Sequence, residues 1–445
     1  MILLFYIKLL FLNFYKSKRY AYIFLIIFNL FHFTKVQAQE HIQLFLNKEK
    51  SHSINFNGSA QFWIRHTDMN PGSLVNNRLR SSMTDLSLRR YRLNFNGNAD
   101  DKIRYVFVLG DNNWNYYTIK NPSIQILDAY IDFQINSHLG IGIGKQGWAG
   151  LSRYSAPGAT QPLAFDIVFP AVPLVNVYDD ILRKWGIYAR GEINKLDYRI
   201  SLTRPKAPTI SGLPNFEKAV FSKNRPEFHL SSYFKYQFKD KESQYTAWMP
   251  GTYLGKKEIF NIGMGGFYQP KSTWLLSGLD TTHHALKAFS MDLFYEKPLA
   301  GNKAITGYFA WFNYDFGRNF IRNIGINNPA TGVLPTESLN GPGNNAPVAG
   351  TGNTMFFQLG YLFPVNAVKN KHFQPYGSFQ YSQFQAFDDA VMMFNTGFNF
   401  YLKGQDSKIT LGYENRPVFS HEENTCTQSL RKGLWILQYQ IRFGR

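Results

Sequence analysis

The 445-residue chain has a single cysteine, Cys426. One cysteine excludes an intrachain disulfide and a metal cluster built from cysteines. No run of eighteen apolar residues occurs after Ala38, which excludes a bundle of transmembrane helices. Charged residues make up only 18% of the chain. The fold must therefore be held together by hydrogen bonds and packing, without a covalent cross-link.

Aromatic residues are abundant instead. They make up 17% of the chain, with 40 Phe and 27 Tyr, although the mean hydropathy is negative. A chain that is rich in aromatics and yet polar on average suits strands with one apolar and one polar face. The length would ordinarily indicate two or three soluble domains, but a single large β-architecture also accommodates it.

The N-terminal 38 residues have the layout of a secretory signal peptide. Basic residues at 16–19 precede an apolar run at 21–33, and the small-residue sequence at 36–38 supplies a cleavage site. A membrane anchor is the alternative, but the apolar run is short for a span. We predict a signal peptide at 1–38, a short N-terminal segment at 39–53 and one domain at 54–445.

The charge balance is positive. Residues 1–38 hold five of the 48 basic residues and no acidic residue, so the remaining chain carries 43 basic against 30 acidic residues, a net charge of +13. A balance of this size is compatible with nucleic acid, an anionic membrane surface or an anionic solute. The predicted export argues against nucleic acid as a partner.

Short alternating segments recur along the chain. In residues 55–65, "NFNGSAQFWIR", the even positions are apolar or small and the odd positions are mostly polar, and the terminal run at 437–443, "LQYQIRF", alternates in the same way. A period of two predicts a strand with one apolar and one polar face. Three of the segments, at 304–316, 354–363 and 391–402, are apolar on both faces. We expect strands at 55–65, 90–97, 102–109, 128–135, 139–145, 184–191, 196–203, 228–238, 259–268, 286–295, 304–316, 354–363, 373–384, 391–402, 408–414 and 434–443.

The connections between these segments alternate in length. Most that follow an even-numbered segment have three to nine residues, whereas those after odd-numbered segments tend to be long. The connection at 239–258 is longer than this rule allows, and the one at 385–390 is shorter. Such alternation is typical of outer-membrane barrels with short periplasmic turns and long external loops. It does not follow from a soluble sandwich, which is the alternative.

The predicted fold is therefore all-β, a transmembrane antiparallel β-barrel of about 16 strands. A closed barrel also satisfies every backbone hydrogen bond inside a bilayer. We expect the last segment, 434–443, to pair with 55–65 and close the barrel, with its apolar face toward lipid.

Two hairpins carry a resemblance to a known family. They are residues 87–110, "SLRRYRLNFNGNADDKIRYVFVLG", and residues 126–146, "ILDAYIDFQINSHLGIGIGKQ", and the proline-containing segment that follows continues it. In this order they resemble the phosphate-selective porin O and P family of Bacteroidetes outer membranes, and the resemblance runs over most of 50–445. It implies a sixteen-stranded homotrimeric porin with a constriction loop in the pore, located in the outer membrane of a Gram-negative bacterium.

In that family, phosphate selection depends on an arginine array and a lysine cluster. Only Arg90 and Arg92 match the arginine-rich strand here, and we find no lysine cluster. The resemblance therefore implies an anion-biased channel in which phosphate is one candidate solute.

A barrel of this size leaves an aqueous channel, so function depends on the charges that face inward. Inward guanidinium and ammonium groups attract anions and replace lost hydration with charge-assisted hydrogen bonds. Alternatively, acidic residues on the same faces, including Asp128, Asp132, Asp197 and Asp292, pair with these cations across the wall. The predicted pore-lining, anion-binding residues are Arg90, Arg92, Lys102, Arg104, Arg153, Lys184, Arg190, Arg199 and Lys235.

The connection at 146–183 is the predicted constriction loop. It follows the fifth strand and is rich in proline. Loops of this length are more often functional than idle, so we predict that it enters the pore. The alternative is that it covers the external mouth.

Motifs for catalysis are weak. His283-His284 and His421-Glu422-Glu423 lack the spacing of a metalloenzyme helix, and no nucleophile, phosphate-loop or dinucleotide motif occurs in a suitable context. We predict no enzymatic activity and no cofactor. The predicted function is a water-filled channel through which small hydrophilic solutes diffuse, with a bias toward anions. The alternative is a plugged barrel that anchors a secretion or surface-protein complex.

Overall fold

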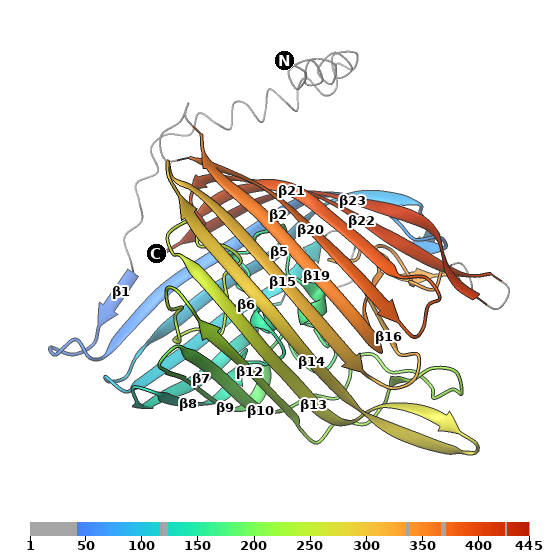
Figure 1. The fold of residues 1–445 in the computed structure, drawn as a ribbon, viewed down its shortest axis with the longest axis horizontal. Coiled ribbons are helices and arrows are strands. Elements are labelled where there is room, and N and C mark those ends of the chain that lie inside the picture. The colour runs from blue at the N-terminus through green and yellow to red at the C-terminus, as the bar shows by residue number, and fades with distance from the viewer. Residues whose placement is uncertain are drawn as a thin grey trace, which may run out of the picture. The chain divides into compact units, whose positions relative to one another are not determined.

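The computed structural model describes residues 42–115, 117, 123–334, 338–365, 371–422 and 425–444. The predicted signal peptide lies outside this part of the chain. Sixteen antiparallel strands form one closed ring in the order of the sequence (Figure 1). The strands of the ring are β2 (Ser53–Asp68), β5 (Ser82–Asn98), β6 (Ile103–Asn115), β7 (Gln125–Asn136), β8 (Leu139–Gln146), β9 (Lys184–Ile193), β10 (Leu196–Arg204), β12 (His229–Gln237), β13 (Ile259–Ser277), β14 (Asp280–Leu299), β15 (Lys303–Asp315), β19 (Gly352–Pro364), β20 (His372–Phe384), β21 (Val391–Lys403), β22 (Ser407–Glu422) and β23 (Thr425–Phe443).

The first and last strands of the ring close the barrel. β2 and β23 pair antiparallel, with Phe62 opposite Tyr439 and Gly58 opposite Phe443. A side chain at Gly58 would collide with the Phe443 ring, so the glycine allows the terminal aromatic residue to lie across β2. This pairing and the sixteen predicted strands are confirmed.

Several strands are longer than the sequence indicates. β13 and β14 continue past a register shift between Gln269 and Thr273 and meet at a two-residue turn, Gly278-Leu279. Gly278 has a φ of 65°, which glycine adopts without strain. The segment 269–285, for which we expected a loop, therefore forms a hairpin that projects beyond the ring, yellow in Figure 1.

The barrel is apolar outside and polar inside. On β19, Met355, Phe357 and Leu359 are 50%, 48% and 47% exposed, whereas Thr354 and Gln358 are buried. A water-soluble protein would bury such an apolar stripe, while a bilayer stabilises it on the outside of a barrel.

Two of the connections that enter the barrel contact each other there. The first is the inserted loop, residues 147–183: its Leu163 and Pro162 carbonyls accept hydrogen bonds from Asn399 of β21 and Lys408 of β22, at 2.7 and 3.2 Å. The second is the turn-end insert, residues 239–258, which follows β12. Its Met249 N–H donates to the Ala156 carbonyl of the inserted loop at 2.8 Å. The connection at 239–258, which is longer than the length rule allows, is therefore long because it enters the lumen.

The inserts contain little regular structure. The inserted loop has two short 3₁₀ turns, Arg153–Ser155 and Phe169–Ala171. In the described part of the chain, no helix combines the length and hydropathy needed to cross a membrane.

An apolar core forms where the inserted loop meets the wall. Leu151, Tyr154 and Val168 of the loop are buried in one cluster with inward-facing aromatic residues such as Phe312 of β15 and Phe356 of β19. We call the region from β9 to β21, where inward side chains contact the inserted loop or the turn-end insert, the filled half of the lumen. It explains why the segments at 304–316, 354–363 and 391–402 are apolar on both faces: one face is exterior and the other contacts the inserted loop.

Candidate functional site

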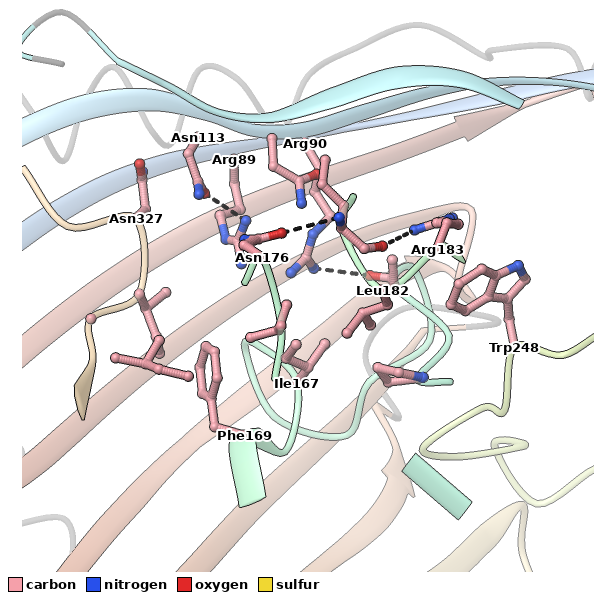
Figure 2. A pocket seen from close by; sticks show the side chains of 18 of the residues that line it. Arg89, Arg90, Asn113, Ile167, Phe169, Asn176, Leu182, Arg183, Trp248 and Asn327 are labelled. Atoms are coloured by element: carbon pink, nitrogen blue, oxygen red, sulfur yellow. Dashed lines mark hydrogen bonds between the residues drawn. The ribbon is translucent and has the colours of Figure 1, made fainter. Parts of the chain in front are cut away.

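A cavity of about 1080 Å³ remains inside the barrel. The inner faces of β2, β5, β6 and β7 form one side of it, and the inserted loop and residues 320–327 and 338–345 form the other. We call this region the open half of the lumen. Figure 2 shows its central part, with Arg89 and Arg90 on one side.

Cationic side chains dominate the lining of this cavity. Eight of them line it, against a single carboxylate, Asp128. Fixed charges of one sign in a recess with low-dielectric walls concentrate the field there and attract counter-ions. The eight cationic residues are Arg89, Arg90, Arg92, Arg104, Arg183, Lys218, Arg322 and Arg442.

A β-bulge turns two consecutive arginines inward. In the pairing of β2 with β5, Gln61 lies opposite Arg90 and Phe62 opposite Leu88, so Arg89 is an extra residue on β5. Arg89 and Arg90 are both buried, although strict alternation would point one of them to lipid. Arg89 also donates to the Asn113 side chain on β6 at 2.6 Å.

Asp166 of the inserted loop binds both of these arginines. Arg89 donates to one of its oxygens from Nη2 at 2.7 Å and from Nε at 3.1 Å, and Arg90 donates to the other oxygen. Burial raises the pKa of Asp166, but the two guanidinium groups outweigh burial and hold the pKa below its usual value. One carboxylate thus neutralises one of two cations and fixes the loop against the wall.

Two further arginines have no carboxylate partner among the described residues. Arg92 donates to the Tyr91 and Asp111 carbonyls at 2.6 and 2.8 Å and to the Asn112 side chain. Arg322 donates to the Val175 carbonyl at 3.4 Å, and its buried Nε has no hydrogen-bond partner. Burial lowers the pKa of Arg322 to about 10, so it is still charged at neutral pH.

Only some of the nine residues predicted to line the pore lie at the cavity. Three of them, Arg90, Arg92 and Arg104, line it together. Lys102 is exposed in the turn between β5 and β6, outside the cavity lining. The other five lie away from the cavity, on β9, β10, β12 and the inserted loop: Arg153, Lys184, Arg190, Arg199 and Lys235.

Four of these five have acidic partners on the same part of the wall or in the inserts. The Arg190 Nε donates to Asp132 at 2.8 Å, and the Lys184 Nζ lies 3.9 Å from Asp179. Arg199, by contrast, donates to a backbone carbonyl, that of Ala247, at 3.1 Å. Pairing with carboxylates, the alternative that the sequence left open, therefore describes most residues outside the cavity.

Glu242 of the turn-end insert is the centre of a buried ion cluster. Both terminal nitrogens of Arg153 donate to it at 2.6 Å, and Lys235 and Asn261 donate at 3.0 and 2.7 Å. The Arg153 guanidinium also lies over the Phe294 ring, 3.7 Å from its centre. Burial raises the pKa of Glu242, but the charges of Arg153 and Lys235 outweigh burial and hold the pKa below its usual value. The group therefore stays ionised. This cluster ties the two inserts to each other and to β12.

Several residues that line the cavity were not predicted from the sequence. Arg89 had a signal, because the apolar positions shift from even at Leu86 and Leu88 to odd at Tyr91 and Leu93, which marks a bulge. Arg183 and Arg322 lie in long connections, where alternation says nothing about direction.

The described residues contain no group of three or more His, Cys, Asp or Glu side chains placed to hold a metal ion. His283 and His284 lie on the projecting part of β14, in the pairing with β13. His421 Nδ1 lies 3.3 Å from the Cys426 sulfur.

No family model and no curated protein matches the chain. Solved structures do match it. Salmonella typhi OmpF, in complex with daunomycin, is 9% identical over 89% of this chain and 99% of that one, with a TM-score of 0.51. Vibrio cholerae OmpT in its trimer form is 8% identical over 88% and 100%, with a TM-score of 0.49. The anion-selective porin from Comamonas acidovorans is 9% identical over 88% and 100%, with a TM-score of 0.48. Of these three structures, OmpF is the one with a TM-score above 0.5. At 9% identity this likeness shows that the two chains share the barrel fold.

Proposed function

We propose that this protein is a diffusion channel of the Gram-negative outer membrane that passes small hydrophilic solutes and prefers anions. The observation that carries the proposal is the lining of the open half, with eight cationic side chains against one carboxylate. The apolar exterior of the barrel supports a location in lipid. The signal peptide at 1–38 and a homotrimeric assembly belong to the same proposal.

Selectivity would arise from fixed charge at a narrowed section. The cavity beside the inserted loop lies against β5, where Arg89, Arg90 and Arg92 occupy consecutive inward positions. A hydrated anion that enters would exchange part of its water shell for charge-assisted hydrogen bonds, whereas a cation would be repelled. In this proposal the inserted loop is the constriction loop.

Phosphate remains a candidate solute. Arginine is suited to bind phosphate oxygens in pairs. However, Arg89, Arg90 and Arg183 already donate to Asp166 or Asp128, so their donors are partly engaged. We therefore propose an anion preference of broad scope.

A second candidate function is a closed barrel that serves as an anchor for a partner complex. The filled half favours it, because the two inserts are joined there by the buried Glu242 cluster. In that case the long external loops would bind the partner, and the barrel would not conduct.

Planar-bilayer recording of the protein purified from membranes distinguishes the two functions. In a KCl gradient we expect stepwise conductance with a reversal potential of anion-selective sign. The double variant Arg92→Gln, Arg322→Gln should shift the reversal potential toward zero. Lys287→Gln removes the same kind of charge from an exposed residue outside the cavity and should leave it unchanged. A cation-selective sign would overturn the proposal, and the absence of conductance would favour the closed barrel.

A further inference from the structure

The cavity of the open half has two walls of different chemistry. The barrel wall presents arginines and asparagines from β5 and β6. The wall built by the inserted loop and residues 320–327 and 338–345 presents many apolar side chains. The apolar lining residues on these two segments are Ile167, Phe169, Val175, Ile181, Leu182, Phe320, Ile321, Ile324, Ile326 and Leu339.

The ion pairs of Asp166 with Arg89 and Arg90 position both walls. Asp166 holds Arg89 and Arg90, and Ile167 and Phe169 follow it directly along the inserted loop. Figure 2 shows the two arginines on one side of the cavity, with Ile167 and Phe169 facing them from the other. The distance between basic and apolar groups is therefore set by an ion pair, not by a free loop.

An aromatic surface and a guanidinium meet at the edge of the cavity. The Arg183 guanidinium lies over the Trp248 ring, 4.0 Å from its centre, and both residues line the cavity. Arg322 lies on the apolar side and has no carboxylate partner among the described residues, so this wall also carries an uncompensated cation.

A small inorganic anion would use only one of these walls. The cavity volume of about 1080 Å³ is at the upper end for a site that encloses an organic molecule. Apolar side chains gain nothing from contact with phosphate or chloride, but they stabilise a hydrocarbon group that leaves water.

We propose that the cavity binds organic anions that carry a hydrophobic body, such as aromatic or branched aliphatic carboxylates. The carboxylate would accept hydrogen bonds from one guanidinium of the lining, Arg92 or Arg322, and the body would lie against Ile167, Phe169 and Ile324. This inference rests on the proposed function, because the solute reaches the cavity by diffusion into the barrel.

Calorimetric titration of the purified full-length mature protein in detergent tests the inference. The probes are 2-naphthoate, acetate, inorganic phosphate and the cation 2-naphthylmethylammonium. We expect 2-naphthoate to bind at least about tenfold more tightly than acetate or phosphate, and the cation not to bind. Equal affinity for phosphate, or binding of the cation, would overturn the inference.

Variants locate the binding surface. Ile167→Thr combined with Ile324→Thr should weaken 2-naphthoate binding about fivefold or more and leave acetate binding unchanged. Val168→Thr is the matched control, because Val168 is a buried neighbour in the same loop that does not line this cavity. An equal loss in the control would overturn the inference. If the double variant does not fold, the four probes on the unaltered protein still decide.

The inference and the proposed function fail in different ways. Anion-selective conductance without a preference for 2-naphthoate would overturn the inference alone. Tight 2-naphthoate binding by a barrel that does not conduct would support the binding site and overturn the channel.

Discussion

The filled and open halves of the lumen use the same kind of strand for different purposes. In the filled half, inward residues such as Phe312 and Phe356 form an apolar core with the inserted loop, and the ion cluster of Glu242 has matched charges. In the open half, Arg89 and Arg90 share one carboxylate, and Arg92 has none among the described residues. The barrel therefore separates a part that holds the inserts from a part in which cations remain in excess.

This division predicts that stability and selectivity respond to different residues. Substitutions in the filled half should alter the free energy of unfolding, because they remove packing or leave buried charges unpaired. Substitutions of cations in the open half should alter ion preference, because these side chains set the charge of the cavity lining. They should change the free energy of unfolding less, because the wall there does not depend on them for packing.

The largest effect is expected from Glu242→Gln. It leaves Arg153 buried without a counter-charge and Lys235 with Asp197 alone, at 3.5 Å, and we expect a loss of about 5 kcal/mol in the free energy of unfolding. Urea unfolding in detergent, followed by tryptophan fluorescence, measures it. Glu258→Gln is the matched control in the same insert: its partner Lys239 is 53% exposed, so the loss should stay below about 1 kcal/mol. Equal losses in the two variants would contradict the filled half as described.

A smaller effect is expected within one strand, β15. Phe312 is buried against the inserted loop and Phe309 is 41% exposed on the outer face. Phe312→Ala should cost about 3 kcal/mol because it leaves a cavity in the core. Phe309→Ala should cost clearly less in the same urea assay, and neither should change the reversal potential. A larger cost at Phe309 would reverse the assignment of the two faces.

The smallest effect on stability is expected from Arg104→Gln in the open half. Arg104 lines the cavity and is only half-buried, so the free energy of unfolding should change by less than about 0.5 kcal/mol while anion preference falls. Arg199→Gln is its counterpart: Arg199 is buried over the Trp148 ring, so its loss should cost about 2 kcal/mol without a change of preference. If both variants changed ion preference equally, the two halves would not be functionally distinct.

The strands were predictable because their signal is local. Alternation at 55–65 and 437–443 assigns each side chain to a face, and the closing pair of β2 and β23 follows once the first and last strands are known. The ends of strands were less predictable. β13 and β14 continue as a projecting hairpin because they pair with each other there, and pairing is not visible in one segment alone.

The cavity was predictable only in part. Arg90, Arg92 and Arg104 were found because they lie on alternating strands, whereas the strand cations Arg190 and Lys235 satisfy the same pattern and yet bind carboxylates. Alternation tells which side chains point inward, but it does not tell what they meet there.

The sequence alone determined the number of strands, the face that most strand side chains occupy and the closure of the ring, because a period of two is a property of neighbouring residues. Only the tertiary structure decided which inward cations remain in excess. That outcome depends on where the inserted loop and the turn-end insert lie in the lumen, and on the carboxylates of Asp166 and Glu242 that they bring there from a distance.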